Sequence, residues 1–409
     1  MASILPFRAL RPTADSAARV AAVPYDVVST SEARELAADN PLSFLHVTRA
    51  EIDLPDDVDP YSAPVYARAR KNLEALRERA PLVIDDVPGL YVYRLGMGGH
   101  QQTGISGCFS LDEYDSGVIR KHERTRPAKE DDRTRHIVEL RAQTGVVFLT
   151  YRATRAIDAL AREIAAGIPL YDFTASDGVH HTVWSAGLEG TRQLVEAFAA
   201  VGALYIADGH HRAASAARAR SEVEQRLGSP ADAADASTFL AVAFSHDQVQ
   251  VLPYHRVVRD LGGRTAESFL RTLRERFSVT EGGAVPERSG RVSVYIDHRW
   301  YALELTGAIP EDDTRASALD VALLQRHVLE PLLRIGDVRS DPRIDFVGGA
   351  RGTRALEQMV DSGGAAIAFS MHPVSVEDLI AVSDAGGTMP PKSTWFEPKL
   401  RDGLLTHLI

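Results

Sequence analysis

The hydrophobic pattern of the chain alternates between short apolar runs and longer amphipathic segments. Short apolar or alternating runs predict strands, and a 3.6-residue apolar period predicts helices. The predicted strands cover residues 89–94, 104–111, 145–151, 182–186, 204–207, 239–244, 250–258, 292–296, 300–305, 344–347 and 365–370. The predicted helices cover residues 66–79, 155–168, 190–200, 211–227, 320–333, 353–359 and 376–382. Strands and helices are intermixed throughout, which indicates a mixed α/β or α+β fold.

The chain has 409 residues, which is too many for one ordinary hydrophobic core. We expect three regions. Residues 1–150 form an N-terminal α/β region with a basic cluster, residues 151–285 a middle region that contains the Asp-Gly-His-His-Arg segment, and residues 286–409 a C-terminal α/β region with a closing tail.

Composition narrows the class of protein. The formal net charge is -10, which argues against general nucleic-acid binding because that requires many cations to neutralise phosphates. The single cysteine, Cys108, excludes a disulfide framework and a cysteine-based zinc site. No apolar run reaches the roughly 18 residues that span a bilayer, and the first residues do not resemble a secretion signal. We therefore expect a soluble cytoplasmic protein that binds neither nucleic acid nor membrane.

The strongest local motif is Ala-Asp-Gly-His-His-Arg at residues 207–212, between an apolar strand and an Ala/Arg-rich helix. The amides at a helix start favour phosphate, and Gly209 lets the backbone approach a ligand closely. Arg212 can bind phosphate oxygens in a bidentate manner, and His210 or His211 can add contacts. The plainer interpretation is that Asp208 caps the helix and both histidines lie on the surface.

A second cluster of charge starts at Lys121-His122-Glu123 and continues past Arg126. Part of it fits a solvated helix face with paired charges. Its basic residues could also neutralise a polyphosphate, and Glu123 could hold Mg²⁺.

Two further segments carry polar residues in unusual settings. Asp26 stands in an apolar stretch before a helix that starts near Ser31, where a carboxylate is either a cap or a general base. The Pro-rich tail places Lys392, Thr394 and Lys399 where they could close over a ligand or simply dock the chain end.

The sequence lacks the glycine-rich loops of P-loop and Rossmann proteins and the serine-hydrolase elbow. Metal-dependent hydrolysis remains an alternative, because four histidines fall within or near the two clusters. They are His122, His136, His210 and His211.

Seven motifs, found in order along the chain, resemble the DUF1015 family. They are PFRALRP at 6–12, VPYDVV at 23–28, NPLSFLH at 40–46, KHE at 121–123, ADGHHR at 207–212, RIDFVGG at 343–349 and PPKSTWFEPK at 390–399.

The Asp-Gly-His-His-Arg segment is also similar to the motif of the ParB/sulfiredoxin-like nucleotide-binding fold, which includes free-serine kinases. This resemblance implies a ParB/sulfiredoxin-like core with large additional α/β segments, and it makes residues 151–285 the nucleotide-binding region. It implies phosphate binding by the 208–212 segment and a catalytic base at Asp26, where those kinases carry a glutamate.

The implied reaction is transfer of a phosphoryl group from ATP or ADP, with Mg²⁺, to L-serine or a similar hydroxy acid. Such a reaction needs a base, a metal ion and cations on the phosphates. We expect Asp26 and His211 in catalysis and Glu123 at the metal. Asp208 to Arg212, Lys121, His122 and Arg126 would bind nucleotide. Arg8, Arg49, Lys392, Thr394 or Lys399 would bind the carboxylate of the acceptor. The alternatives are a ParB-like nucleotide switch and the hydrolase, and a homodimer is one possible assembly.

Overall fold

The chain forms two compact units in a computed structural model that describes residues 1–79, 81–227, 234–305 and 314–409. Unit 1 contains Met1–Val249 and Pro398–Ile409, and unit 2 contains Gln250–Glu397. These units do not coincide with the three regions expected from the sequence, because the main sheet of unit 1 takes strands from both the first and the second region.

Unit 1 is built on a mixed eight-stranded sheet. Its strands, in spatial order, are β5 Ile119–Arg120, β10 Leu204–Asp208, β7 Val147–Tyr151, β11 Thr238–Ser245, β4 His100–Ser110, β3 Tyr91–Met97, β9 His180–Ser185 and β8 Tyr171–Thr174. β10 runs parallel to β5, β11 runs parallel to β7, and the other neighbours are antiparallel. Every residue of β7 and β11 is buried, which explains their nearly continuous apolar sequences.

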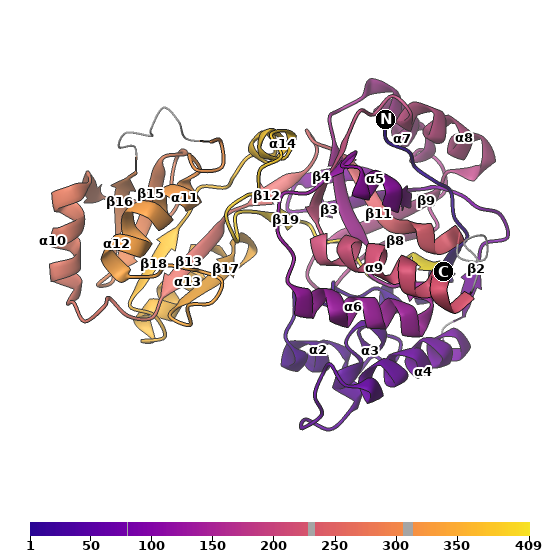
Figure 1. Cartoon of the computed structure of the whole chain (residues 1–409), viewed down its shortest axis with the longest axis horizontal. Coiled ribbons are helices and arrows are strands. Elements are labelled where there is room, and N and C mark those ends of the chain that lie inside the picture. Colours follow the sequence, from indigo (N-terminus) through magenta and orange to yellow (C-terminus); the bar gives the residue numbers. More distant parts are fainter. Residues whose placement is uncertain (80, 228–233, 306–313) are drawn as a thin grey trace. The chain divides into compact units, whose positions relative to one another are not determined.

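The helices of unit 1 cover this sheet and extend away from it. They are α1 Ala14–Val20, α2 Thr30–Ala37, α3 Leu45–Thr48, α4 Ala63–Arg79, α5 Leu111–Asp115, α6 Pro127–Leu140, α7 Arg155–Ile164, α8 Gly187–Phe198 and α9 His210–Leu227, with 3₁₀ turns η1 Ala50–Asp53 and η2 Ala234–Ser237. α9 packs against α6, and α6 packs against α4, so these helices form successive layers (Figure 1). α7 packs against α8.

The C-terminal segment returns to unit 1 through a second, four-stranded sheet. Its order is β2 Leu82–Ile84, β1 Ala9–Pro12, β20 Thr406–Leu408 and β6 Ala142–Gln143. Asp402 also pairs with Ala22 through two backbone hydrogen bonds, of 2.9 and 3.1 Å. The last residues of the chain are therefore held beside the segment that carries Asp26.

Unit 2 has a six-stranded antiparallel sheet with its own hydrophobic core. The strand order is β14 Val279–Glu281, β16 Arg299–Glu304, β15 Arg291–Ile296, β18 Ile367–Ser370, β13 Tyr254–Val258 and β17 Ile344–Gly348. A separate pair joins β12 Gln250–Leu252 to β19 Trp395–Glu397. The helical elements are α10 Ala266–Arg276, α11 Asp320–Leu324, the π-turn η3 Gln325–Leu329, α12 Glu330–Leu333, η4 Gly349–Arg351, α13 Gly352–Asp361 and α14 Val376–Asp384.

The mixed α/β class is confirmed, and three of the predicted elements are divided, shortened or distorted for identifiable reasons. The strand over 250–258 is divided at Pro253, which has no N–H for a ladder bond. The helix over 155–168 ends at Ile164, shortly before Gly167 and Pro169. The helix over 320–333 contains a π-turn, because Pro331 cannot donate a bond to His327 four residues earlier.

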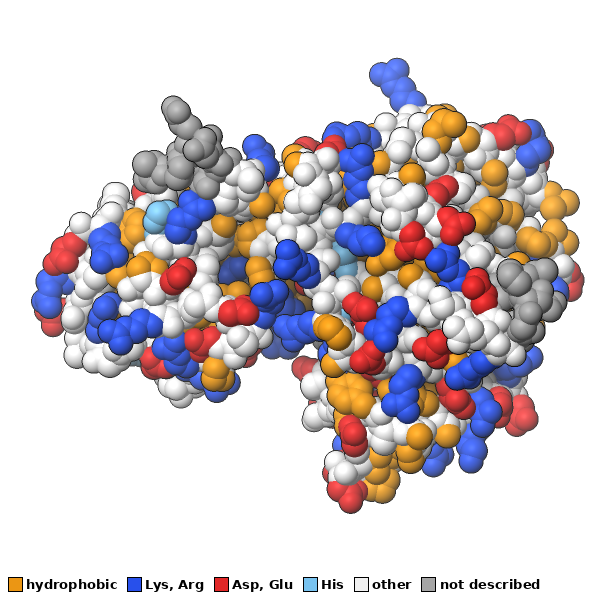
Figure 2. All heavy atoms as spheres, viewed as in Figure 1, with side chains coloured by type: hydrophobic (Ala, Val, Ile, Leu, Met, Phe, Trp, Pro, Cys, Tyr) orange, Lys and Arg blue, Asp and Glu red, His pale blue; other side chains and the backbone are white. Residues whose placement is uncertain are grey.

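Charged side chains of both signs are interspersed over the visible face of each unit (Figure 2). Among the described residues, no helix combines the length and apolarity that crossing a membrane requires.

Candidate functional site

The predicted strand-to-helix turn is present, with β10 ending at Asp208 and α9 beginning at His210. The β10–β7 register shifts between Ile206 and Asp208, so the strand is irregular where it meets the turn. Gly209 has φ +95°, and a Cβ there would lie 3.2 Å from Nη1 of Arg212 and 3.3 Å from Cα of Val147. Only glycine satisfies both conditions without strain.

Arg212 joins the turn to Asp26, which lies 186 residues earlier in the sequence. Nη2 of Arg212 donates to both carboxylate oxygens of Asp26, at 3.1 and 3.0 Å, and Nη1 donates to the carbonyl of Val146. The Arg212 side chain is only 5% exposed. Burial alone would lower its pKa, but Asp26 and Asp208 raise it, so the guanidinium stays charged.

Asp208 lies between two cations. Nζ of Lys399 is 3.1 Å from Oδ2 of Asp208, and Nη2 of Arg212 is 3.8 Å from the same oxygen. Burial alone would raise the pKa of Asp208, but Lys399 and Arg212 lower it below its usual value. The carboxylate is therefore ionised at neutral pH.

His210 is buried against the Lys121-His122-Glu123 segment. Its Nε2 accepts the backbone N–H of His122 at 3.4 Å, and its Nδ1 is 3.9 Å from Oε2 of Glu123. The two imidazole rings meet edge to face at 4.4 Å between centroids. Burial is the main reason that the pKa of His210 falls well below its usual value and that of His122 falls to about 4. Both rings are therefore neutral at pH 7.

His211 is the half-buried histidine of the pair, and its Nδ1 makes no hydrogen bond within the described structure. Burial lowers its pKa, Asp26 raises it, and Lys129 and Arg126 add to the lowering. Arg126 is exposed and stands at the N-cap of α6. The charges of Asp26 and Arg126 thus both act on the imidazole of His211.

The other predicted cations of unit 1 have different partners. Lys121 places its ammonium 3.7 Å from the centroid of the Tyr114 ring. Arg8 donates to the backbone carbonyl of Asp85 at 2.8 Å.

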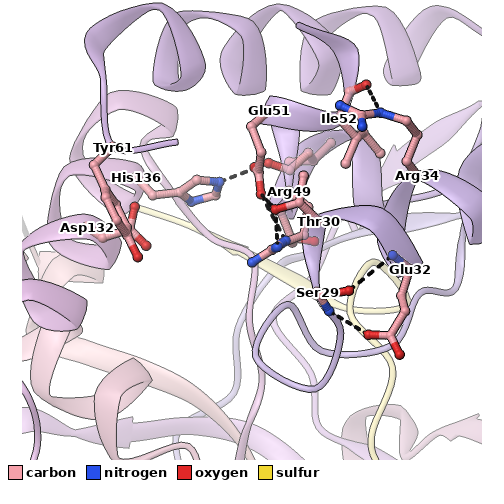
Figure 3. Close-up of polar contacts among 12 residues, drawn as sticks. Ser29, Thr30, Glu32, Arg34, Arg49, Glu51, Ile52, Tyr61, Asp132 and His136 are labelled. Atoms are coloured by element: carbon pink, nitrogen blue, oxygen red, sulfur yellow. Dashed lines mark hydrogen bonds and ion pairs between the residues drawn. The ribbon is translucent and has the colours of Figure 1, made fainter. Parts of the chain in front are cut away.

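Arg49 is held beside the helix that follows Asp26. It lies 3.0 Å from Glu51 and donates to the hydroxyl of Thr30, the first residue of α2, at 2.8 Å (Figure 3). The N-cap of α2 is Ser29, which forms a capping box with Glu32 (Figure 3).

The tail residues expected to bind substrate are divided between the units. Lys399 belongs to unit 1 and pairs with Asp208, whereas Lys392 and Thr394 belong to unit 2. Lys392 has φ +58° and places its ammonium 5.3 Å from the centroid of the Tyr254 ring. Arg256 is buried in the same unit and donates to the carbonyl of Lys392 at 3.3 Å.

Sequence reasoning did not identify Asp402, whose side chain is buried beside the Asp26–Arg212 pair. Its Oδ1 accepts the N–H of Val146 at 3.4 Å, and Val146 in turn offers its carbonyl to Arg212. Burial raises the pKa of Asp402 to about 7, opposed by Arg212 and reinforced by Asp26. The only feature of the sequence that could have pointed to Asp402 is the presence of an acidic residue among the apolar residues of the tail.

Asp402 should make stability depend on pH. From about pH 4 to about pH 7 the folded protein keeps a proton that the unfolded chain has released, so the free energy of unfolding falls as pH rises. Asp402→Asn keeps an acceptor oxygen and cannot ionise. In urea unfolding, we expect the variant to gain about 3 kcal/mol relative to the parent between about pH 5 and about pH 8. A stability difference that does not change with pH would contradict this assignment.

The described residues contain no group of three or more His, Cys, Asp or Glu side chains arranged to hold a metal ion. His136 does not join His122 and His210, because its Nε2 lies 3.0 Å from the carbonyl of Val47 (Figure 3). The four histidines of the hydrolase alternative therefore do not form one protein-only metal site. A magnesium ion that also takes phosphate oxygens needs fewer protein ligands, and Asp208 and Glu123 have the oxygen donors it prefers.

The fold and the site together define a mixed α/β protein in which a strand-to-helix Asp-Gly-His-His-Arg turn is joined to a distant carboxylate. A family model described as "Protein of unknown function (DUF1015)" matches residues 4–322. The chain therefore belongs to the DUF1015 family.

Comparison with solved structures finds similar chains at low identity. A conserved hypothetical protein from Pyrococcus furiosus is 13% identical, with a TM-score of 0.35, covering 73% of this chain and 94% of its own. A mutant free serine kinase in complex with ADP is 14% identical, with a TM-score of 0.35, covering 72% and 92%. SbnI with a C-terminal truncation from Staphylococcus aureus is 12% identical, with a TM-score of 0.38, covering 73% and 85%. No curated protein matches the chain.

Proposed function

We propose that this protein is a nucleotide-dependent kinase that phosphorylates the hydroxyl group of a small hydroxy acid, with L-serine as the leading acceptor. The observation that carries the proposal is the contact of Nη2 of Arg212 with both carboxylate oxygens of Asp26. It brings a partly exposed carboxylate to the helix start where the motif predicts phosphate binding. Phosphoryl transfer requires this combination of a base and an anion site.

Asp26 is the proposed base. Its carboxylate retains 30% exposure while Arg212 fixes its orientation from the buried side. The oxygen of the acceptor hydroxyl would attack the terminal phosphorus of the nucleotide, and the bond to the bridging oxygen would break. The hydroxyl proton would pass to Asp26, and the nucleotide would leave with one phosphate fewer.

The nucleotide phosphates would bind at the N-terminus of α9. The backbone amides after Gly209 and the positive end of the helix favour anions. The half-buried His211 at the start of α9 and the exposed Arg126 at the N-cap of α6 would contact the phosphates. Asp208 and Glu123 would share Mg²⁺, which neutralises charge on the transferred group.

We propose a positioning role for Arg212, although its residue type and place in the motif predict a phosphate contact. Its donors already serve Asp26 and the carbonyl of Val146. Lys399 likewise serves Asp208, and in this role it would help to place the metal or the nucleotide.

The proposal is tested by measuring nucleotide conversion by chromatography with Mg²⁺ and ATP or ADP, with and without an acceptor. L-serine, L-threonine and D-glycerate make an informative panel. We expect L-serine to increase conversion at least about 10-fold over the rate without acceptor. If no hydroxy acid increases conversion, the proposal is wrong. CTP-selective binding with retention of DNA would instead support a nucleotide switch.

A further inference from the structure

A pocket of about 430 Å³ lies in unit 1 between α4 and the segment of residues 41–53. Its volume is within the range of small-molecule sites in proteins. Its polar lining includes His46, Asp53, Arg68, Lys71, Asn72 and Arg79. Neither Asp26 nor any residue of the 208–212 turn lines it, so it is separate from the proposed kinase site.

The wall contributed by α4 is cationic. Arg68, Lys71 and Arg79 all line the pocket, because their spacing places them on one face of the helix. All three are exposed, and within the described part of the chain neither Lys71 nor Arg79 makes an ion pair. Lys71 and Arg79 are therefore available to a ligand without breaking a salt bridge. Arg68 lowers the pKa of Asp53 through its charge, but within the described residues it too makes no ion pair.

The opposite wall carries an ordered histidine. Nδ1 of His46 lies 2.8 Å from Oδ1 of Asp53. Asn72 donates to Oδ2 of Asp53 and to the carbonyl of His46, both at 2.6 Å. The hydrogen bond to Asp53 raises the pKa of His46 against the effect of burial, which favours the charged imidazolium.

The charge of the pocket is consequently positive. Asp53 is the only carboxylate among the lining residues, and its oxygens are occupied by His46 and Asn72. The remaining lining includes the apolar side chains of Val47, Ala75 and Leu76. An anion joined to a compact apolar group matches both parts of this lining.

We infer that this pocket binds a small organic phosphate monoester. Arg68 and Lys71 would hold the phosphate, since guanidinium and ammonium groups form charge-assisted hydrogen bonds to its oxygens. His46 would add positive charge from the facing wall. The organic group would pack on Ala75 and Leu76. This assignment does not depend on the proposed kinase reaction.

Phenyl phosphate is a suitable probe, and isothermal titration calorimetry measures its binding to the full-length protein. The test variant is the double substitution Arg68→Gln and Lys71→Gln. Arg77→Gln is the matched control, because Arg77 is an exposed cation of α4 that does not line the pocket. The substituted side chains are exposed, so urea unfolding should show unchanged stability in both variants.

We expect the parent and the Arg77→Gln control to bind phenyl phosphate with the same Kd within about 2-fold. The double variant should raise the Kd at least about 10-fold, because it loses two charge-assisted contacts. ADP should bind both variants as it binds the parent. Absence of phenyl phosphate binding by the parent would overturn the inference. So would an unchanged Kd in the double variant, which would locate the probe elsewhere, for example at the 208–212 turn.

Discussion

Replacing Asp26 with asparagine should lower turnover by a factor of about 10² to 10⁴ and leave nucleotide affinity within about 3-fold of the parent value. Asparagine has nearly the same shape, and its amide oxygen can still accept from Arg212. It cannot take the proton of an acceptor hydroxyl. The loss should therefore fall on kcat, as expected for a group that acts in the transition state.

The comparison requires steady-state kinetics and nucleotide titration on the same preparations. Asp39→Asn is the matched control, because Asp39 is an exposed acidic residue and the described structure gives it no hydrogen bond or ion pair. It should retain parental kcat. Full activity of Asp26→Asn would remove Asp26 from the mechanism, and equal losses in both variants would indicate an effect of net charge.

Replacing Arg212 with alanine should reduce both stability and activity. The guanidinium is almost fully buried and compensates Asp26 and Asp208 together. Its removal leaves two carboxylates without their shared cation and leaves the carbonyl of Val146 unpaired. Breaking a buried ion pair costs about 3 to 5 kcal/mol of unfolding free energy. We expect about 3 kcal/mol here, because Asp26 is partly exposed. Urea unfolding measures this loss directly.

The activity of Arg212 variants separates positioning from general destabilisation. Arg212→Lys keeps the charge, but a single ammonium cannot hold Asp26 and the carbonyl of Val146 with the fixed, planar spacing of the two guanidinium nitrogens. We expect it to recover more than half of the lost stability while kcat stays at least about 10-fold below the parent value. If the lysine variant regains full kcat, the geometry of the Arg212–Asp26 contact has no part in turnover.

The local elements of the site could be predicted from the sequence. An apolar run followed by Asp-Gly and an Ala/Arg-rich segment predicts a strand, a tight turn and a helix. The structure places the helix start at His210, within one residue of the prediction. The helix after Asp26 was expected near Ser31 and begins at Thr30. These features depend on neighbours in sequence, which is why pattern alone identifies them.

The partners of the site residues could not be predicted in the same way. A guanidinium group such as that of Arg212 can bind either a phosphate or a carboxylate. Arg212 contacts Asp26 because the fold brings together segments that are far apart in the chain. Lys399 reaches Asp208 because the last residues return to unit 1 through β20, a strand of only three residues. Such a short strand carries almost no periodic signal. Asp402 was missed for the same reason.

Arg8 and Arg49 illustrate the limit of assigning roles by residue type. Each was expected to hold a substrate carboxylate. Arg8 contacts the backbone carbonyl of Asp85, and Arg49 contacts Glu51 and Thr30. A substrate role for Arg49 would require it to exchange a protein carboxylate for a ligand carboxylate. That role remains a prediction for both residues.

The most direct test of the kinase assignment is phosphorus NMR of the reaction itself. The parent protein and Asp26→Asn would each be incubated with Mg²⁺, L-serine and ATP or ADP. We expect a growing O-phosphoserine resonance with the parent and none with the variant, although both bind nucleotide. If the parent forms neither O-phosphoserine nor any other phosphorylated hydroxy acid offered to it, the joined Asp26 and Asp208–Arg212 site is not a kinase site.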